Sequence, residues 1–533
     1  MKKKVWGILG ILLVFLAVRA DDFYPRNRGI DVLHYHFQVS LTGKGKNIRV
    51  RAELKIRLEN PTIKRISLDL KGDQMRVEAV EMNRQPLTFQ RQTGKIWIDL
   101  PPDHQSLGVD LNVNISGVPF GGLIVRPNKY GTETYLADHW PDQASGWLPC
   151  NDHPSDKATC EFLVTAPARY QVVATGILRE TRDLPGGFRL THWREEAPVA
   201  TKVMMIAVSR FAVQYQLTDT GIPVQTWVYT EDRQPGFQAF QVVPEVLNFF
   251  TRLIGPYSYA KIASVQGPTL YGGLENAGAV TYHERALENP PLVNLIAHEM
   301  AHQWFGDSVT EASWDHVWLS EGFATYFTTL FQEFARNPRE LPRRMAAARD
   351  RVIRFYRRHP DRSVVDPGLT DIHQILSANT YQKGAWVLHM LRVKLGDETF
   401  FKGIRRYYRL YQNRNAWTRD FQKAMEAVSE EDLGDFFRQW IFSPGIPELS
   451  GDWRFDSRRE RLRIRLDQRQ SAGTVFDFPL EIALYFPDRP VPDIRELYIR
   501  ERRNRLVLPC PRSPVRVELD PNVRVLMIAD FKN

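Results

Sequence analysis

The chain has 533 residues, of which 43% are hydrophobic, 25% are charged and only three are cysteine. This length predicts more than one domain, and the hydrophobic share is ample for sizeable cores. The formal net charge is +9, but the basic residues are spread along the chain without an arginine-aromatic block, so nucleic acid is not an expected partner. Cys150, Cys160 and Cys510 are too few for a disulfide scaffold or an all-cysteine zinc site. Cys150 and Cys160 are either bridged to each other or buried as free thiols.

Residues 1–20 have the pattern of a secretory signal peptide. Three lysines at positions 2–4 precede an apolar run over residues 5–18, and Ala20 ends the segment at a small-residue cleavage site. The apolar run is too short to cross a bilayer comfortably. We therefore expect a secreted or periplasmic protein whose signal is removed. The alternative is that the segment is retained as a membrane anchor.

Residues 21–217 are expected to form an antiparallel β domain. From Ile48 to Leu58, apolar and charged residues alternate strictly, and a period of two is typical of a strand with one buried face. Shorter runs at residues 35–39 and 95–98 are separated by glycine, proline and asparagine turns.

In residues 218–446 the spacing of apolar residues becomes helical, and the first helix is expected near residues 242–254. A boundary rich in proline and glycine follows this region. Strand-like alternation then returns at residues 462–466 and 515–519, so residues 447–533 are expected to form a small β-sandwich. The expected fold class is therefore multidomain α+β.

Two neighbouring helices of the middle region carry the residues of greatest interest. Asn289, which precedes two prolines, is expected to cap the first of them, and Gly306 is expected to end it. Ser320 is expected to cap the second helix, which places Glu321 in its first turn.

The first of these helices contains His298-Glu299-Met300-Ala301-His302, which has the spacing of a metal site. Residues four apart lie on one face of a helix, so His298 and His302 can offer two imidazole nitrogens to one ion. Glu299 would reach a water on that ion, and Glu321 would return on the second helix as a third ligand. Two histidines and one carboxylate, with the fourth position open to water, are typical of catalytic zinc. We therefore expect one Zn²⁺ per chain rather than two solvated histidines.

Several segments together resemble the aminopeptidase N and leukotriene hydrolase family of zinc metallopeptidases, the gluzincin aminopeptidases. They are His-Glu-Met-Ala-His-Gln-Trp-Phe-Gly-Asp at 298–307 and Trp-Leu-Ser-Glu-Gly at 318–322. Gly-Gly-Leu-Glu-Asn at 272–276 is similar to the family's exopeptidase motif, and Tyr-Gln-Lys-Gly at 381–384 to the segment with its catalytic tyrosine. The resemblance implies a β domain, a thermolysin-like, mostly helical zinc peptidase domain and a β-sandwich, with the boundaries given above.

The resemblance implies a zinc-dependent aminopeptidase that hydrolyses the N-terminal residue from peptides. His298, His302 and Glu321 would be the zinc ligands. Glu299 would act as general base and then general acid on the zinc-activated water, and Tyr381 would stabilise the oxyanion.

The same resemblance implies a binding site for the free N-terminus of a peptide. Glu275 would bind the cationic α-amino group, which fixes the first residue relative to zinc. Gly272 and Gly273 would leave room for the peptide backbone, and Asn276 belongs to the same substrate-binding motif.

Two departures from the family pattern leave the pocket undetermined. Leu274 stands where the family usually has methionine. Many members also have a glutamine or glutamate that grips the α-amine, and that position falls at or near Trp140, whose indole N–H cannot accept a hydrogen bond. Either Asp138 or Asp142 takes its place, or Glu275 works with less help.

Two other functions compete with this prediction: a bifunctional aminopeptidase and epoxide hydrolase, and a non-catalytic peptide-binding relative. The complete set of ligands, base and tyrosine disfavours the non-catalytic alternative. Asp315 is expected to orient a metal ligand. The remaining histidines considered are expected to be structural or exposed: His34, His36, His153, His283, His316 and His389. The sequence predicts neither the preferred N-terminal residue nor the oligomeric state.

Overall fold

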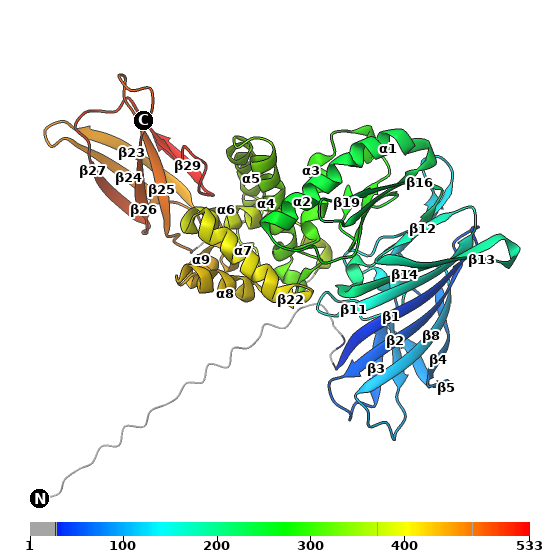
Figure 1. Ribbon diagram of the computed structural model, residues 1–533. Helices are drawn as coiled ribbons and strands as arrows, with labels where there is room; N and C mark the ends of the chain where they lie inside the picture. The colour runs from blue at the N-terminus through cyan, green and yellow to red at the C-terminus, as the bar shows by residue number, and fades with distance from the viewer. Residues whose placement is uncertain (1–26, 28, 370, 472, 533) are drawn as a thin grey trace, which may run out of the picture.

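The computed structural model describes residues 27, 29–369, 371–471 and 473–532. The predicted signal segment, residues 1–20, lies outside this part of the chain. Figure 1 shows two groups of strands at opposite ends of the molecule and a helical region between them. No helix among the described residues has both the length and the apolar composition needed to cross a membrane.

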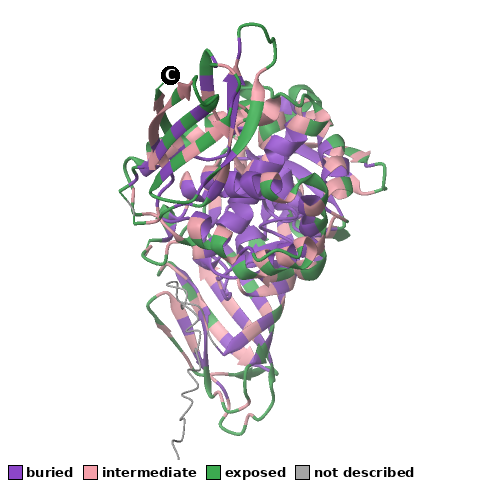
Figure 2. Ribbon diagram, turned by 90° about the vertical axis from the view of Figure 1, so that its left-hand side faces the viewer, coloured by how far each residue is buried: buried purple, intermediate pink, exposed green. Residues whose placement is uncertain are grey.

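The N-terminal strands build an eight-stranded sheet. In spatial order its strands are β13 (Ile177–Leu184), β14 (Phe188–Ala200), β11 (Lys157–Pro167), β1 (Ile30–Leu41), β2 (Ile48–Leu58), β8 (Gly108–Gly117), β4 (Met75–Met82) and β5 (Gln85–Pro86). The predicted alternation is that of β2, and bands of buried and more exposed residues cross the strands of this sheet in Figure 2.

The prediction of a purely antiparallel domain is wrong in one respect. Strands β1 and β11 are parallel neighbours, with His36 opposite Glu161. Alternation in a sequence indicates which face of a strand is buried, but it does not indicate the partner or the direction of pairing.

Two smaller sheets complete the N-terminal region. One contains β12 (Gln171–Ala174), β15 (Ile206–Ser209), β10 (Glu133–Ala137) and β9 (Leu123–Pro127), and the other contains β3 (Arg65–Asp69), β7 (Lys95–Asp99) and β6 (Phe89–Gln92). The apolar side chains of all three sheets share one hydrophobic core. Cys150 and Cys160 are buried in this core as free thiols, which decides between the two alternatives left by the sequence.

The central region combines a five-stranded sheet with helices. The sheet order is β16 (Phe211–Leu217), β17 (Pro223–Tyr229), β18 (Ile262–Gly267), β20 (Ala279–His283) and β19 (Gly273–Leu274). The helices are α1 (Arg233–Ala239), α2 (Val243–Leu253), α3 (Val293–His302), α4 (Trp318–Ala335), α5 (Glu340–Tyr356), α6 (Gly384–Leu395), α7 (Asp397–Tyr411), α8 (Thr418–Ser429) and α9 (Gly434–Phe437). A short parallel pair, β21 (Val309–Glu311) and β22 (Arg414–Ala416), lies in the same region. The predicted boundary at residue 217 falls inside the β16–β17 hairpin, and the domain boundaries stay predictions.

The C-terminal region contains two further sheets. One has the order β27 (Arg503–Pro509), β24 (Arg461–Gln468), β23 (Glu448–Asp456) and β29 (Ile528–Lys532), and the other has the order β26 (Asp493–Ile499), β25 (Phe478–Tyr485) and β28 (Arg516–Leu519). Their buried side chains belong to the same hydrophobic core as those of the helical region. The C-terminal strands are therefore packed continuously with the helices.

The starts of α3 and α4 differ from the prediction. Asn289 lies outside α3, which begins at Val293, so it is not the cap of that helix. Ser320 lies inside the first turn of α4, which begins at Trp318, so it does not cap that helix either. Glu321 lies in the first turn of α4, as predicted.

Candidate active site

Helices α3 and α4 bring two histidines and a glutamate together. His298 and His302 lie on one face of α3, and Glu321 faces them from α4. The Nε2 atoms of the two histidines are 3.3 Å apart, and Oε2 of Glu321 lies 3.3 Å from that of His302 and 3.5 Å from that of His298. The structure thus assembles the three predicted ligands, which we call the metal triad.

The metal triad fits a zinc ion. Ligands about 2.0–2.1 Å from a tetrahedral zinc lie about 3.4 Å from one another, which is the size of this triangle. Oε2 of Glu321 is buried without a hydrogen-bond donor of its own. A buried anion in this setting needs a cation, and two imidazoles with one carboxylate favour zinc.

The second ring nitrogen of His302 is held by neighbouring groups. Its Nδ1 lies 3.0 Å from Oγ of Ser320 and 3.2 Å from the carbonyl oxygen of Phe305. Because a carbonyl can only accept, the proton is on Nδ1 and the lone pair of Nε2 faces the metal position. The hydroxyl of Ser320 therefore serves the metal site rather than the helix end. Asp315 contacts Ser313 instead of a metal ligand, so its predicted role is wrong.

Glu299 lines the same pocket, and a glycine makes room for it. A Cβ atom on residue 273 would lie 2.4 Å from Oε1 of Glu299, so Gly273 is required for this close approach. At Gly272 the nearest atom would be 3.9 Å away, which is ordinary contact. Burial, together with the carboxylates of Glu275 and Glu321, raises the pKa of Glu299 well above its ordinary value.

Tyr381 approaches the metal triad from a π-helical turn, Asn379–Lys383, that leads into α6. Its ring stacks on that of His298, with the ring centroids 6.1 Å apart and an angle of 18° between the planes. Burial and the charge of Glu321 raise the pKa of the Tyr381 hydroxyl well above its ordinary value. The hydroxyl therefore stays protonated and can donate a hydrogen bond beside the metal position.

Glu275 presents an unpaired carboxylate oxygen in the pocket. Its side chain is buried, lines the pocket with the metal triad, and its Oε1 has no hydrogen-bond partner among the described residues. Asn276, predicted to bind substrate with it, is fully buried and donates its amide to the hydroxyl of Thr281 at 3.0 Å. Asn276 and Gly272 are not among the residues that line the pocket.

Gln303 fixes the segment that carries Glu275. Its Nε2 donates to the carbonyl oxygen of Glu275 at 3.0 Å and to the carboxylate of Asp307 at 2.8 Å. Its Oε1 accepts from the backbone N–H of Gly278 at 2.9 Å. Gln303 was not predicted from the sequence as a site residue. Its position directly after His302 is the feature of the sequence that could have indicated a role in the site.

The other wall of the pocket is aromatic and aliphatic. Trp140 packs edge-on against Tyr271 and Trp314, with ring centroids 6.0 and 5.8 Å apart. Trp140 and Tyr271 line the pocket together with Leu274 and Leu376. The pocket is therefore apolar at the position where the sequence departs from the family pattern.

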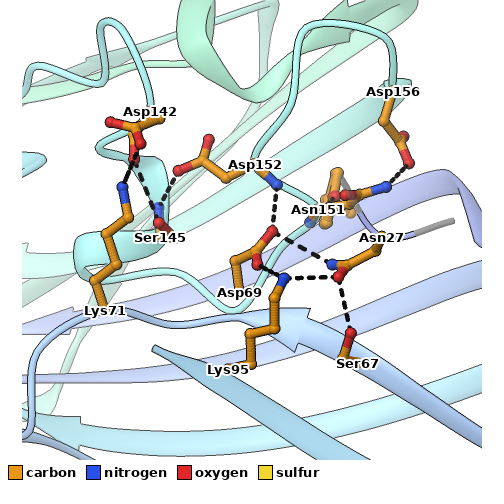
Figure 3. A network of polar contacts seen from close by, with 11 residues as sticks. Asn27, Ser67, Asp69, Lys71, Lys95, Asp142, Ser145, Asn151, Asp152 and Asp156 are labelled. Carbon is orange, nitrogen blue, oxygen red and sulfur yellow. Dashed lines mark hydrogen bonds and ion pairs between the residues drawn. The ribbon is translucent and has the colours of Figure 1, made fainter. Parts of the chain in front are cut away.

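The two aspartates near Trp140 are engaged elsewhere. Oδ2 of Asp138 accepts hydrogen bonds from the hydroxyl of Thr269 at 2.8 Å and from a backbone N–H at 3.0 Å. Oδ2 of Asp142 lies 2.6 Å from Nζ of Lys71. Figure 3 shows this pair in a polar network of the N-terminal region. Neither aspartate lines the pocket. Of the alternatives left by the sequence, the structure therefore favours the one in which Glu275 works without help from Asp138 or Asp142.

Comparison with protein families decides the relationship of the chain. Residues 32–203 match the Peptidase M1 N-terminal domain, and residues 238–440 match the Peptidase family M1 domain. The chain belongs to peptidase family M1. This confirms the family that the motifs predicted, and both matches fall within the N-terminal and central regions described above.

Known relatives of this M1 peptidase include glutamyl aminopeptidase from Bitis rhinoceros, which is 28% identical over 66% of this chain and 39% of that protein. Aminopeptidase M1 from Arabidopsis thaliana is 30% identical over 58% of this chain and 37% of that protein. The chain thus spans less than half the length of these relatives.

Similar solved structures include the M1 zinc metallopeptidase from Deinococcus radiodurans. It shares 28% identity and a TM-score of 0.67 over 79% of this chain and 96% of that chain. A mutant of that enzyme bound to a Tyr-Ser-Ala substrate shares 27% identity and a TM-score of 0.68 over 79% of this chain and 97% of that chain. The family and these structures indicate a catalytic zinc in this M1 peptidase, and the metal triad is the site that fits it.

Proposed function

We propose that this M1 peptidase is a zinc-dependent aminopeptidase that hydrolyses the N-terminal residue from peptides. The observation that carries the proposal is that the unpaired carboxylate oxygen of Glu275 and the metal triad line one pocket. A free α-amino group is cationic, and a buried carboxylate without a partner suits it. A peptide held by its amino terminus has its first peptide bond, rather than an internal one, beside the metal.

The side chains around the metal position can perform the steps of hydrolysis. Zinc, when bound by the metal triad, would act as a Lewis acid that polarises the scissile carbonyl and would lower the pKa of a bound water molecule. Glu299 accepts a proton from the attacking water and delivers it to the departing amine. Tyr381, kept protonated by its raised pKa, donates a hydrogen bond to the developing oxyanion.

The pocket wall supports a preference for an apolar or aromatic first residue. Trp140, Tyr271, Leu274 and Leu376 form this wall, and no lysine or arginine is among the described residues that line the pocket. An acidic first residue would therefore lack a basic partner. Two solved M1 structures hold the Tyr-Ser-Ala substrate and L-tryptophan, which agrees with an aromatic first residue.

A panel of amino-acid p-nitroanilides tests both parts of the proposal. The wild type should cleave free-amine leucine, phenylalanine and tyrosine anilides faster than the glutamate anilide, and should not cleave their Nα-acetyl forms. Glu275→Gln keeps the shape of the side chain but removes its charge, so KM for free-amine substrates should rise about 10- to 100-fold. Equal rates on acetylated and free substrates would sink the proposal.

Two further experiments separate the alternatives. Conversion of a lipid epoxide to a diol would reveal an added epoxide hydrolase activity, which stays a prediction. If zinc-loaded protein bound peptides and hydrolysed none of them, the non-catalytic peptide-binding alternative would hold instead.

We also propose that the protein is exported. The support is the lysine-rich start and apolar run within residues 1–20. N-terminal sequencing of protein from fractionated cells tests this. A chain starting at residue 21 supports removal of the signal, whereas an intact N-terminus in the membrane fraction supports an anchor.

For the C-terminal region we propose a β-sandwich, in which its two sheets pack face to face. Leu462 of β24 and Ile482 of β25 belong to one hydrophobic core, which supports this arrangement. Burial also alternates along most of β24 and β25, as expected for strands with one face in a shared core.

A further inference from the structure

A second cluster of metal-binding side chains lies on the N-terminal sheet, outside the active site. It consists of His34 and His36 on β1, Glu161 on β11, and His192 and Arg194 on β14. Strand β11 lies between the other two, and Glu161 is opposite His36 on one side and Arg194 on the other. Because residues two apart in a strand share a face, all five side chains project from the same face of the sheet.

The carboxylate of Glu161 is the centre of this cluster. Its Oε1 lies 3.5 Å from Nε2 of His34, and its Oε2 lies 4.0 Å from Nδ1 of His36 and 2.7 Å from Nε2 of His192. The Glu161 side chain is only 9% exposed. One nitrogen of His34, one of His36 and one oxygen of Glu161 all lie within 4.8 Å of one another.

The hydrogen bonds of His34 are compatible with a metal ligand at its Nε2. The hydroxyl of Thr159 lies 2.7 Å from Nδ1 of His34 and 3.2 Å from the carbonyl oxygen of Leu33. When this hydroxyl donates to Leu33 it accepts from Nδ1, and the lone pair of Nε2 then faces Oε1 of Glu161, 3.5 Å away.

We propose that His34, His36 and Glu161 bind a divalent transition-metal ion of the zinc class. Two imidazoles and one carboxylate suit such an ion, whereas Ca²⁺ and Mg²⁺ prefer sites made of oxygen alone. The ligand atoms lie within 4.8 Å of one another, which is wider than the edge of about 3.4 Å expected around zinc, so the side chains move closer together on binding. His192 donates a hydrogen bond to Oε2 of Glu161 and thereby orients the carboxylate. The ion links the parallel strands β1 and β11. Because it binds the folded N-terminal region and not the unfolded chain, it stabilises the folded state.

Arg194 competes with a metal for Glu161, but it has a second partner. Its Nη1 lies 2.9 Å from Glu161, while its Nε and Nη2 lie 2.8 and 3.2 Å from the carboxylate of Glu196. The Arg194 side chain is 41% exposed, so contact with Glu196 alone costs little free energy. The cluster also opens into a surface pocket whose lining includes the acidic Glu53 and Asp110 as well as the basic Lys55, so an ion can reach the cluster from solvent.

The zinc content of untagged protein tests this proposal. After treatment with a chelator, reloading with zinc and gel filtration, metal analysis should find about two zinc ions per wild-type chain and about one in the variant with both His34→Ala and His36→Ala. His359→Ala, which removes an exposed histidine of the helical region, should keep about two. Anilide hydrolysis should be unchanged in the double variant, because the ion it loses is not the catalytic one.

Two further variants exclude misfolding as the cause of a lost ion. Glu161→Gln preserves the shape of the side chain and should also lose one ion. His302→Ala lacks an active-site ligand and should keep one ion, whose addition raises the thermal midpoint of unfolding. A single zinc per wild-type chain, two ions in the double variant, or no zinc-dependent rise of the midpoint in His302→Ala would overturn the proposal.

Discussion

The carboxylate of Glu299 occupies the space that a side chain on Gly273 would need. A Cβ atom there would lie 2.4 Å from Oε1 and 2.6 Å from Cδ of Glu299. The variant Gly273→Ala therefore displaces the carboxylate from its position beside the metal triad. We expect kcat/KM for an amino-acid anilide to fall about 100-fold, as it does when a catalytic group moves by about 1 Å. Zinc content, measured in the same preparation, should stay unchanged.

Gly272→Ala is the matched control for this prediction. The added methyl group would meet its nearest neighbour, Cδ1 of Leu295, at 3.9 Å, which is ordinary contact. Its activity should stay near that of the wild type. Equal losses in the two variants would show that steric displacement of the general base is not the cause.

The variant Ser320→Ala should weaken zinc binding. It removes the hydroxyl that lies 3.0 Å from Nδ1 of His302 and leaves only the carbonyl oxygen of Phe305 to hold that nitrogen. Loss of such a contact typically lowers metal affinity by about 10- to 100-fold, and we expect a fall near the lower end. Competition with a fluorescent chelator measures the dissociation constant. Asp315→Asn is the control and should bind zinc as the wild type does, because Asp315 contacts no metal ligand.

Replacement of Gln303 should affect both stability and substrate binding. In Gln303→Met, the carbonyl oxygen of Glu275 and the N–H of Gly278 lose their side-chain partner. Each buried group left without its partner costs about 1–3 kcal/mol, so the free energy of unfolding should fall by about 2–6 kcal/mol. Because the Glu275 segment is no longer fixed, KM for free-amine anilides should rise more than kcat falls. Chemical unfolding and steady-state kinetics provide the two readouts. An unchanged KM would count against the proposal that Gln303 fixes the Glu275 segment.

The stability of the N-terminal region should depend on pH through His139. Nε1 of Trp147 donates to Nε2 of His139 at 2.9 Å, and Nδ1 of His139 lies 2.9 Å from the carbonyl oxygen of Thr201, so the ring is neutral. Burial lowers the pKa of His139 from 6.5 to about 4. Between these two values the unfolded chain binds the additional proton, so this stabilisation is complete above the higher value and is lost as the pH falls.

Chemical unfolding at two pH values measures this effect. We expect His139 to account for a loss of about 2 kcal/mol between pH of about 7.5 and pH of about 5. His139→Asn should be less stable than the wild type at neutral pH but should lose less on acidification. A variant with the same loss as the wild type would show that another group is responsible.

The metal triad could be predicted from the sequence because its chemistry follows from local spacing. Helical periodicity places His298 and His302 on one face, and Glu321 belongs to a second recognisable helix. The starts of those helices could not be predicted in the same way. Asn289 and Ser320 have the side chains of helix caps, but the helices start elsewhere and tertiary contacts use the Ser320 hydroxyl for His302.

Contacts between segments far apart in the chain account for what the sequence missed. The alternation of His34 and His36 places both on one face of a strand, but it gives no indication that β11 is the parallel neighbour that brings Glu161 to them. For the same reason the sequence left open what replaces the amine-binding residue near Trp140. The answer depends on Thr269, to which Asp138 is bound.

Mass spectrometry of the products from one peptide in two forms, with a free and with an Nα-acetylated amino terminus, tests the central claim most directly. The account predicts stepwise loss of single residues from the amino terminus of the free peptide, no cleavage of the acetylated one, and no reaction of either after zinc is removed. Internal fragments released from the acetylated peptide by the zinc-loaded protein would contradict it.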